Sequence, residues 1–230
     1  MDDPRDEYIA GVVKGKSFAD VGGLWGTVNE KVSVAHGAGA AEVTMIDVTA
    51  PDGRLWDEFR SRVLSLGLPT PRCLSGDIVA LAESPAFPRF DVVHCSGVIY
   101  HVPDPMRLLT ALRKITREYL ILSSAVTATE LSNEAGVLNI PAATAIFVPA
   151  LQQHERDILR AHWSPVVGGL AAGLTSDVAS WKVNEFGPWW WLPTVEALKA
   201  MCMAAGFTVM AGAYYWNNNA YSLMLSVPGE

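Results

Sequence analysis

The sequence predicts a doubly wound α/β fold with a mostly parallel, seven-stranded sheet. Three observations lead to this prediction. Apolar stretches alternate with segments of helical periodicity, which is typical of strands and the helices that cover them. A glycine-rich turn follows the first stretch, and the chain ends in a hairpin that would add an antiparallel strand at the edge of the sheet. With 230 residues the chain can bury one sizeable core, so we expect a single domain over 1–230 with one long insertion.

The elements up to residue 83 follow from local patterns. They are an amphipathic helix over 5–16, an apolar strand at 17–20, a helix over 27–36 with apolar residues at helical spacing, an apolar strand at 42–48, a helix over 53–66 that Gly67 and Pro69 end, a brief strand at 72–74 and a short helix over 78–83. The helix at 5–16 either lids a site or only packs on the core.

The remaining elements are assigned in the same way. They are an apolar strand at 90–95, a helix over 106–116 that Pro103 and Pro105 set up, a strand at 119–126 that is apolar along most of its length, a helix over 152–163, a helix from its N-cap Thr194 to Gly206, and alternating strands at 207–216 and 221–227 joined by asparagines. Between 127 and 188 the pattern is otherwise irregular. We expect 127–188 to be an insertion between strands five and six that caps the site and shapes an acceptor pocket.

The composition limits the class of partner. The net charge is −7, with 17 lysines and arginines against 24 acids, and nucleic-acid affinity depends mainly on basic residues, so nucleic acid is an unlikely partner. No apolar run reaches the roughly 18 residues of a membrane span, and the acidic start lacks a signal core, which predicts a cytoplasmic protein without a membrane segment. The three scattered cysteines favour neither a disulfide framework nor a metal site. The composition leaves open whether the protein forms a homo-oligomer.

The stretch 17–26, S-F-A-D-V-G-G-L-W-G, has the strand, turn and helix layout of a nucleotide-binding unit. Its glycines, Gly22, Gly23 and Gly26, permit a tight turn and the close approach of a ligand to the backbone. Asp20 ends the first strand. Asp47 ends the second strand, where a carboxylate can accept hydrogen bonds from two ribose hydroxyls. For the glycine turn the alternative is a tight turn that binds nothing, and for Asp47 it is an aspartate at the end of a strand that faces solvent.

Asp77 and Ile78 follow the third strand. An acid at this place can reach the amino group of an adenine, and it can equally cap the short helix that begins at Ile78. The two roles are compatible.

Several motifs resemble those of the class I S-adenosylmethionine-dependent methyltransferases, from about residue 17 onward. D-V-G-G-L-W-G at 20–26 is similar to the first motif of that family, with Leu24 in place of the middle glycine. G-V-I-Y-H-V-P-D-P at 97–105, W-L-P-T at 191–194 and A-A-G-F at 204–207 resemble the branch that includes tRNA wobble-uridine carboxymethyltransferases and many small-molecule methyltransferases.

The resemblance implies a Rossmann-like fold and S-adenosyl-L-methionine as the cofactor. It implies that Asp47 holds the ribose, that Asp77 and Ile78 hold the adenine, and that Ser96 and Gly97 border the methionine moiety. The tRNA enzymes of the branch carry a basic N-terminal region, and here only residues 1–16 precede the first strand. Together with the acidic balance, this favours a small-molecule or peptide acceptor.

The chemistry expected from this resemblance is an in-line methyl transfer. His101 is the candidate base, because it follows the fourth strand and a neutral imidazole can accept a proton near pH 7. Tyr100 is the candidate for orienting the acceptor. The alternative for both is a structural role in the loop, whereas His94 lies in the strand pattern and is expected in the core.

Two other functions stay open. One is a tRNA-modifying enzyme that acts on the wobble uridine, which a basic groove beside the site would favour. The other is a cofactor-binding scaffold without catalysis. The tryptophans at 189–191 favour an apolar or aromatic acceptor, although at least one of them is expected to close the core under the cap.

Overall fold

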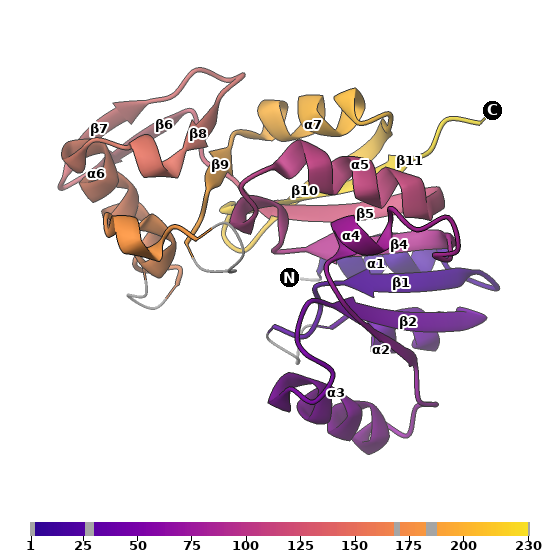
Figure 1. Cartoon of the computed structure of the whole chain (residues 1–230). Helices are drawn as coiled ribbons and strands as arrows, with labels where there is room; N and C mark the ends of the chain where they lie inside the picture. Colours follow the sequence, from indigo (N-terminus) through magenta and orange to yellow (C-terminus); the bar gives the residue numbers. More distant parts are fainter. Residues whose placement is uncertain (1–2, 26–29, 168–170, 183–187, 230) are drawn as a thin grey trace.

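The computed structural model of the chain describes residues 3–25, 30–167, 171–182 and 188–229. One seven-stranded sheet dominates it, in the order β10-β11-β5-β4-β1-β2-β3 (Figure 1). The strands are β1 (Ser17–Val21), β2 (Glu42–Asp47), β3 (Arg72–Ser75), β4 (Phe90–Ser96), β5 (Thr116–Ala125), β10 (Thr208–Tyr215) and β11 (Ala220–Ser226). The predicted doubly wound α/β fold is confirmed.

One strand of this sheet is antiparallel. β11 pairs antiparallel with β5 on one side and with β10 on the other, so β10 closes the edge in the same direction as β1 to β5. The turn between them places Trp216, Asn217 and Asn218 at positive φ, a backbone conformation that asparagine tolerates well. The C-terminal hairpin therefore forms as its sequence predicts.

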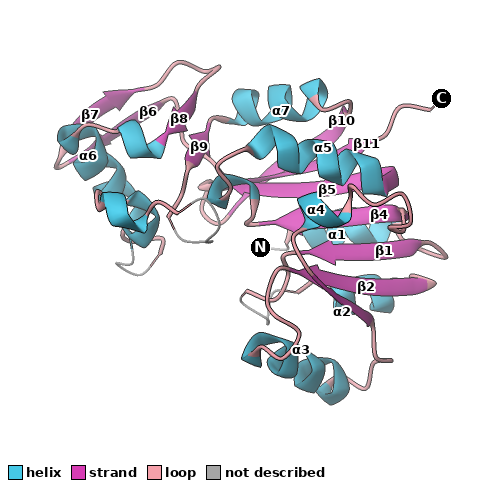
Figure 2. Ribbon diagram, in the orientation of Figure 1, coloured by secondary structure: helices cyan, strands magenta, loops and turns pink. Residues whose placement is uncertain are grey.

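Helices cover both faces of the sheet (Figure 2). On one face lie α1 (Pro4–Val12), α2 (Val32–Gly37) and α3 (Arg54–Ser65). On the other face lie α4 (Ile78–Leu81), α5 (Pro105–Ile115) and α7 (Val195–Ala204). Because side chains alternate along a strand, Ala19 and Val21 pack under α5, whereas Phe18 and Asp20 face α1 and α2. The polar side chain of Asp20 therefore lies on the face of the sheet that α1 and α2 cover.

The described residues between 127 and 188 form a unit beside the sheet (Figure 1), and they pack around a second apolar cluster that also includes Ala125, Trp189 and Leu192. Its described residues form a hairpin of β6 (Glu130–Asn133) and β7 (Gly136–Asn139), the strand β8 (Ala145–Phe147), the helix α6 (Gln153–Trp163) and the short 3-10 helices η3 (Val148–Ala150), η4 (Ala171–Leu174) and η5 (Val178–Ser180). β8 pairs with β9 (Trp191–Pro193), which ties the unit to the chain beyond it. The sequence pattern predicts only the helix of this unit.

A buried arginine holds the unit together. Arg156 on α6 is 3% exposed, and its guanidinium donates to the carbonyl oxygens of Val148, Leu151, Leu174 and Thr175. These carbonyls belong to η3, η4 and the residues next to them. A guanidinium has five donors, so one side chain can satisfy several buried carbonyls at once.

Candidate functional site

The glycine turn lies at the carboxyl end of β1. Gly22 has φ +79°, and its N–H donates to the Ile46 carbonyl of β2 (2.8 Å). A Cβ at Gly22 would collide with the Val98 side chain, and a Cβ at Gly23 would collide with the Asp20 carboxylate. Both positions therefore need glycine, Gly22 also for its backbone conformation. Gly26 lies outside the described residues.

The Leu24 side chain explains why this turn tolerates a leucine. Leu24 is fully buried, in a cluster that contains Met45, Trp56 and Phe59. Its side chain packs into the core between β2 and α3, while its N–H donates to Asp47 Oδ2 (3.3 Å). The leucine thus adds core contacts without covering the backbone of Gly22 and Gly23.

Asp20 supports this turn from inside the protein. Its side chain is 1% exposed, with Oδ1 2.7 Å from His94 Nδ1 and Oδ2 accepting from the Lys31 N–H (2.8 Å). A buried carboxylate needs such donors, because an unpaired one carries a large desolvation cost. Both oxygens have protein partners, so this arrangement favours a role in holding the turn.

His94 lies in the core, as the strand pattern predicts. β1 and β4 place Asp20 and His94 side by side in register, and His94 is 3% exposed. Because an ionised carboxylate only accepts, Nδ1 carries the proton of this bond. The other ring nitrogen, Nε2, is buried and has no hydrogen-bond partner among the described residues. The strand pattern alone gives no sign of the pairing with Asp20.

Asp47 lies at the carboxyl end of β2 and is 7% exposed. Its Oδ1 accepts from the N–H and the hydroxyl of Thr49 (2.9 and 2.7 Å), and its Oδ2 accepts the long bond from Leu24. A carboxylate has about four acceptor positions, so the three donors from described residues leave about one for a ligand hydroxyl.

Asp77 caps α4, with its Oδ1 accepting from the Val79 N–H (2.9 Å), and its side chain is exposed. Ile78 is buried in the main core. The Gly76 N–H donates to the Asp47 carbonyl (2.8 Å), which holds the turn after β3 against the end of β2. The two acids thus follow neighbouring strands at the same edge of the sheet.

The loop after β4 contains the remaining predicted site residues. Gly97 has φ +76°, and a Cβ there would lie 3.5 Å from the Tyr100 hydroxyl. Tyr100 and His101 lie on η2 (Ile99–His101), with ring centroids 4.4 Å apart. Burial raises the pKa of the Tyr100 phenol above its ordinary value, so this hydroxyl stays protonated at neutral pH.

An ionic cluster from α1 and the residue before α2 reaches this loop. Arg5 donates to Ser96 Oγ (3.0 Å), pairs with Asp3 (2.6 Å) and lies over the Tyr215 ring (4.7 Å). Lys31 pairs with Asp3 (2.7 Å) and Asp6 (2.5 Å). Burial alone would raise the pKa of Asp3, but the bonds from Arg5 and Lys31 outweigh it and hold this pKa well below its usual range. The amphipathic pattern of 5–16 predicts a helix here and does not reveal its polar partners.

The tryptophans at 189–191 connect the insertion to this loop. The Trp190 N–H donates to the Tyr100 carbonyl (2.7 Å), and Trp191 Nε1 donates to the Pro103 carbonyl (3.0 Å). Trp189 is 7% exposed and packs edge-on against Tyr100, with centroids 5.4 Å apart, and against Trp163. As expected, at least one of the three closes the core of the insertion.

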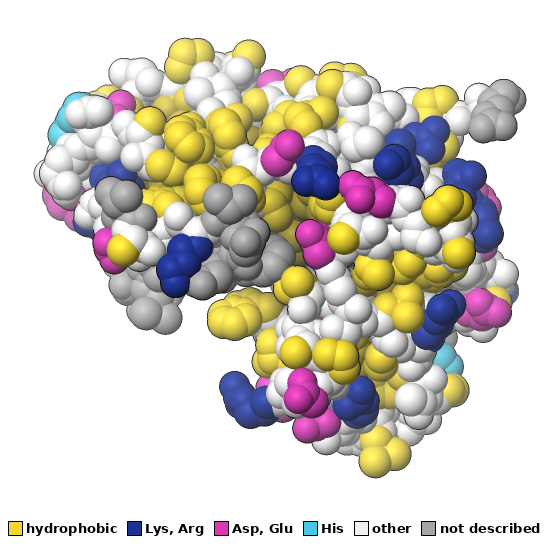
Figure 3. Space-filling model, in the orientation of Figure 1, with side chains coloured by type: hydrophobic (Ala, Val, Ile, Leu, Met, Phe, Trp, Pro, Cys, Tyr) yellow, Lys and Arg dark blue, Asp and Glu magenta, His cyan; other side chains and the backbone are white. Residues whose placement is uncertain are grey.

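Hydrophobic side chains border a recess between the insertion and the sheet (Figure 3). Trp25, on the glycine turn, is 84% exposed.

Within the described residues we find no group of three or more histidine, cysteine or acidic side chains arranged to hold a metal ion. No helix in the described part of the chain has the length and apolar character needed to cross a bilayer.

Comparison with solved structures gives the fold. Magnesium protoporphyrin IX methyltransferase from Synechocystis PCC 6803, solved with bound SAH, aligns over 98% of this chain and 82% of its own at 14% identity and a TM-score of 0.59. The glycopeptide N-methyltransferase MtfA, complexed with S-adenosylhomocysteine, aligns over 99% and 91% at 15% identity and a TM-score of 0.57. The 1,6-didemethyltoxoflavin-N1-methyltransferase of Burkholderia thailandensis aligns over 99% and 80% at 12% identity and a TM-score of 0.55.

No protein-family model matches the sequence, and no curated protein matches it. The likeness to the solved structures shows that the chain has a methyltransferase fold.

Proposed function

We propose that this chain is an S-adenosylmethionine-dependent methyltransferase that acts on a small-molecule or peptide acceptor. One observation carries the proposal. The glycine turn after β1, Asp47 after β2 and the Ser96–Gly97 turn after β4 lie at one edge of a sheet with the fold of methyltransferases. In open α/β sheets, ligands bind outside the carboxyl ends of the strands.

The residues at this edge fit the cofactor. Asp47 has about one acceptor position for a ribose hydroxyl. The exposed carboxylate of Asp77 can accept from an amino group while it caps α4. Ser96 and Gly97 would border the amino-acid end, where Arg5 supplies a guanidinium and Asp3 a carboxylate.

When bound, the cofactor supplies an activated methyl group on a sulfonium. The task of the protein is to hold the acceptor in line and to exclude water. The tryptophans that follow the insertion link it to the loop after β4, because the Trp190 N–H donates to the Tyr100 carbonyl and the Trp189 ring packs against the Tyr100 ring. We assign residues 127–188 as the cap of the acceptor pocket.

His101 and Tyr100 have different roles in this proposal. His101 accepts a proton from the acceptor, because η2 places it beside the Tyr100 ring at the carboxyl edge of the sheet. Tyr100 orients the acceptor as a hydrogen-bond donor, because its raised pKa keeps the phenol protonated. The apolar border of the recess and the exposed ring of Trp25 favour an apolar or aromatic acceptor.

Cofactor binding is the first test. Isothermal titration calorimetry with S-adenosylmethionine and S-adenosylhomocysteine should show saturable binding that Asp47→Ala weakens at least about tenfold, since a hydrogen bond to a charged group contributes roughly 1.5–3 kcal/mol. The control is Asp52→Ala, an exposed acid in the next turn that should bind as the wild type does. Absence of cofactor binding in the wild type would remove the proposal.

Methyl transfer is the second test. A panel of aromatic small molecules and peptides, assayed for S-adenosylhomocysteine release, should contain an acceptor for which His101→Gln lowers kcat roughly 100-fold and leaves the cofactor Kd unchanged. Salt-sensitive binding and methylation of tRNA would instead identify an RNA-modifying enzyme. Cofactor binding without turnover on any acceptor would identify a scaffold.

A further inference from the structure

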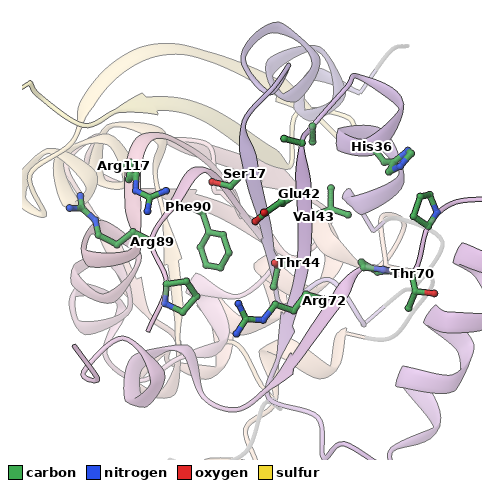
Figure 4. A pocket seen from close by; sticks show the side chains of 15 residues that line it. Ser17, His36, Glu42, Val43, Thr44, Thr70, Arg72, Arg89, Phe90 and Arg117 are labelled. Atoms are coloured by element: carbon green, nitrogen blue, oxygen red, sulfur yellow. The ribbon is translucent and has the colours of Figure 1, made fainter. Parts of the chain in front are cut away.

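A second candidate site lies at the amino ends of the parallel strands, opposite to the carboxyl ends that form the candidate methyltransferase site. A cavity of about 560 Å³ opens where β1 to β5 begin, and its lining includes Ser17, Glu42, Arg72 and Phe90, the first residues of four of these strands (Figure 4). The candidate methyltransferase site lies at the other ends of the same strands. The chemistry proposed above does not use this cavity.

Three arginines line the cavity from three different segments. Arg72 begins β3, Arg89 directly precedes β4, and Arg117 is the second residue of β5. Glu42 is the one carboxylate among the lining residues, and His36 adds an imidazole. Three cations stand against Glu42 and against Asp91, which lies just outside the lining and pairs with Arg117, so the local formal charge is +1 in a chain whose net charge is −7. The sign of the charge at this cavity is therefore opposite to that of the whole molecule.

Most guanidinium donors in the cavity are available to a ligand. Arg72 is exposed, and its guanidinium has no ion pair or hydrogen bond with any described residue. Arg89 donates from Nη2 to the Thr116 carbonyl (3.1 Å). Arg117 makes one ion pair, to Asp91 Oδ1 at 3.3 Å, while the other oxygen of Asp91 is held by Ser17. Each guanidinium carries five donors, so the three side chains leave many unused.

The framework of the cavity is rigid and partly polar. Pro69, Pro71 and Pro88 lie in its wall, and proline fixes the backbone φ, so little chain entropy is lost when a ligand binds. Thr44 contributes a hydroxyl-bearing side chain and is 4% exposed. In Figure 4 the Phe90 ring lies between Arg72 on one side and Arg89 with Arg117 on the other. Phe90 is 5% exposed and forms part of the floor.

We propose that this cavity binds a phosphorylated small molecule through a phosphate or diphosphate group. Several guanidiniums that converge from separate segments suit an anion with more than one charge and several acceptor oxygens, and arginine forks match phosphate geometry. The volume lies in the range of small-molecule sites. A neighbouring cavity of about 460 Å³ shares Arg89 and Arg117 and adds Arg113 and one carboxylate, Glu118, so its lining also carries more cations than anions.

The test is calorimetry on the full chain at low ionic strength, with inorganic pyrophosphate as the probe. Wild type should bind saturably, and Arg72→Gln and Arg89→Gln should each weaken binding on the order of tenfold, because each loses a charge-assisted donor. The control is Arg54→Gln, which removes the same charge from an exposed helix position where Arg54 pairs with Glu58. Thermal unfolding checks that each variant is folded, and Arg72 is the safest position because its guanidinium makes no hydrogen bond or ion pair with any described residue.

Further arms identify the ligand. A nucleoside diphosphate that binds more tightly than pyrophosphate would support the proposal and show that the rest of the cavity holds an organic group. Three results would overturn it: no saturable binding of pyrophosphate at millimolar concentration, a control Arg54→Gln that weakens binding as much as Arg72→Gln and Arg89→Gln do, or binding of an RNA oligonucleotide only. The proposal is independent of methyl transfer, because Arg72→Gln should leave the affinity for S-adenosylhomocysteine unchanged.

Discussion

Replacing His94 with leucine removes one of the two donors that the described residues offer to the Asp20 carboxylate beneath the glycine turn. In the wild type Asp20 accepts from His94 Nδ1 at 2.7 Å and from the Lys31 N–H at 2.8 Å, and its side chain is 1% exposed. After His94→Leu, Oδ1 of this buried carboxylate has no donor among the described residues. Of the two bonds named above, only the one to Lys31 is left to hold the turn.

The magnitude follows from the burial of this pair. Breaking a buried, charged hydrogen bond costs about 3–5 kcal/mol when the charge stays behind. The substitution also removes the buried Nε2 that has no partner, and this offsets part of the loss. We therefore expect the free energy of unfolding to fall by about 3 kcal/mol. In a protein of this size 1 kcal/mol corresponds to roughly 2–4 °C, so Tm should fall by about 6–12 °C.

The assay combines calorimetric unfolding with titration of S-adenosylhomocysteine. His94→Leu should weaken cofactor binding on the order of tenfold, because the turn is no longer held in one conformation. His94→Asn offers an amide N–H near the place of Nδ1 and should restore most of both losses. The control is Thr116→Val, which removes a buried hydroxyl bond to the Leu112 carbonyl (2.7 Å) and should cost roughly 1 kcal/mol without changing cofactor affinity.

The reasoning about Asp20 would be refuted by either of two results. One is a His94→Leu variant that unfolds at the temperature of the wild type. The other is a loss of cofactor affinity no larger than that of Thr116→Val. A third measurement separates support of the turn from general stability: in Asp20→Asn the second substitution, His94→Leu, should cost clearly less than it does in the wild type.

Two further predictions concern titratable groups. The pKa of Asp3 is lowered in the folded protein, so the folded state stays deprotonated there to lower pH than the unfolded state, and this stabilisation is complete above about pH 4 and is lost as the pH falls further. Asp3→Asn should therefore flatten the decline of Tm in acid, whereas the control Glu7→Gln, which changes an exposed acid on the same helix, should not. Burial raises the pKa of Cys202 to about 12 and also raises that of Cys95. At pH 8 a thiol reagent should therefore label the half-buried Cys73 first, and the two buried cysteines only after unfolding in guanidinium chloride. Rapid labelling of Cys95 in the folded protein would contradict its buried environment.

Local sequence pattern identified most strands and helices of the main sheet and the glycine turn after β1, although α1 and α2 are shorter than the predicted helices. Hydrophobic periodicity identifies strands and helices because each element must bury one face, and this requirement is visible within a few residues. Glycine at 22 and the prolines before α5 mark turns for the same local reason. The insertion was predicted less completely, since β8 pairs with β9 across more than forty residues.

The side-chain partners were decided only by the tertiary structure. Asp20 meets His94 because β1 lies beside β4 in one particular register, and Arg5 meets Ser96 because α1 packs on that face of the sheet. Arg72, Arg89 and Arg117 line one cavity because parallel strands begin at the same edge. Outside the insertion, the sequence alone determined roughly which residues form strands, turns and helices. Which strands lie side by side depends on long-range packing, and strand order and register then decide which charges share a site.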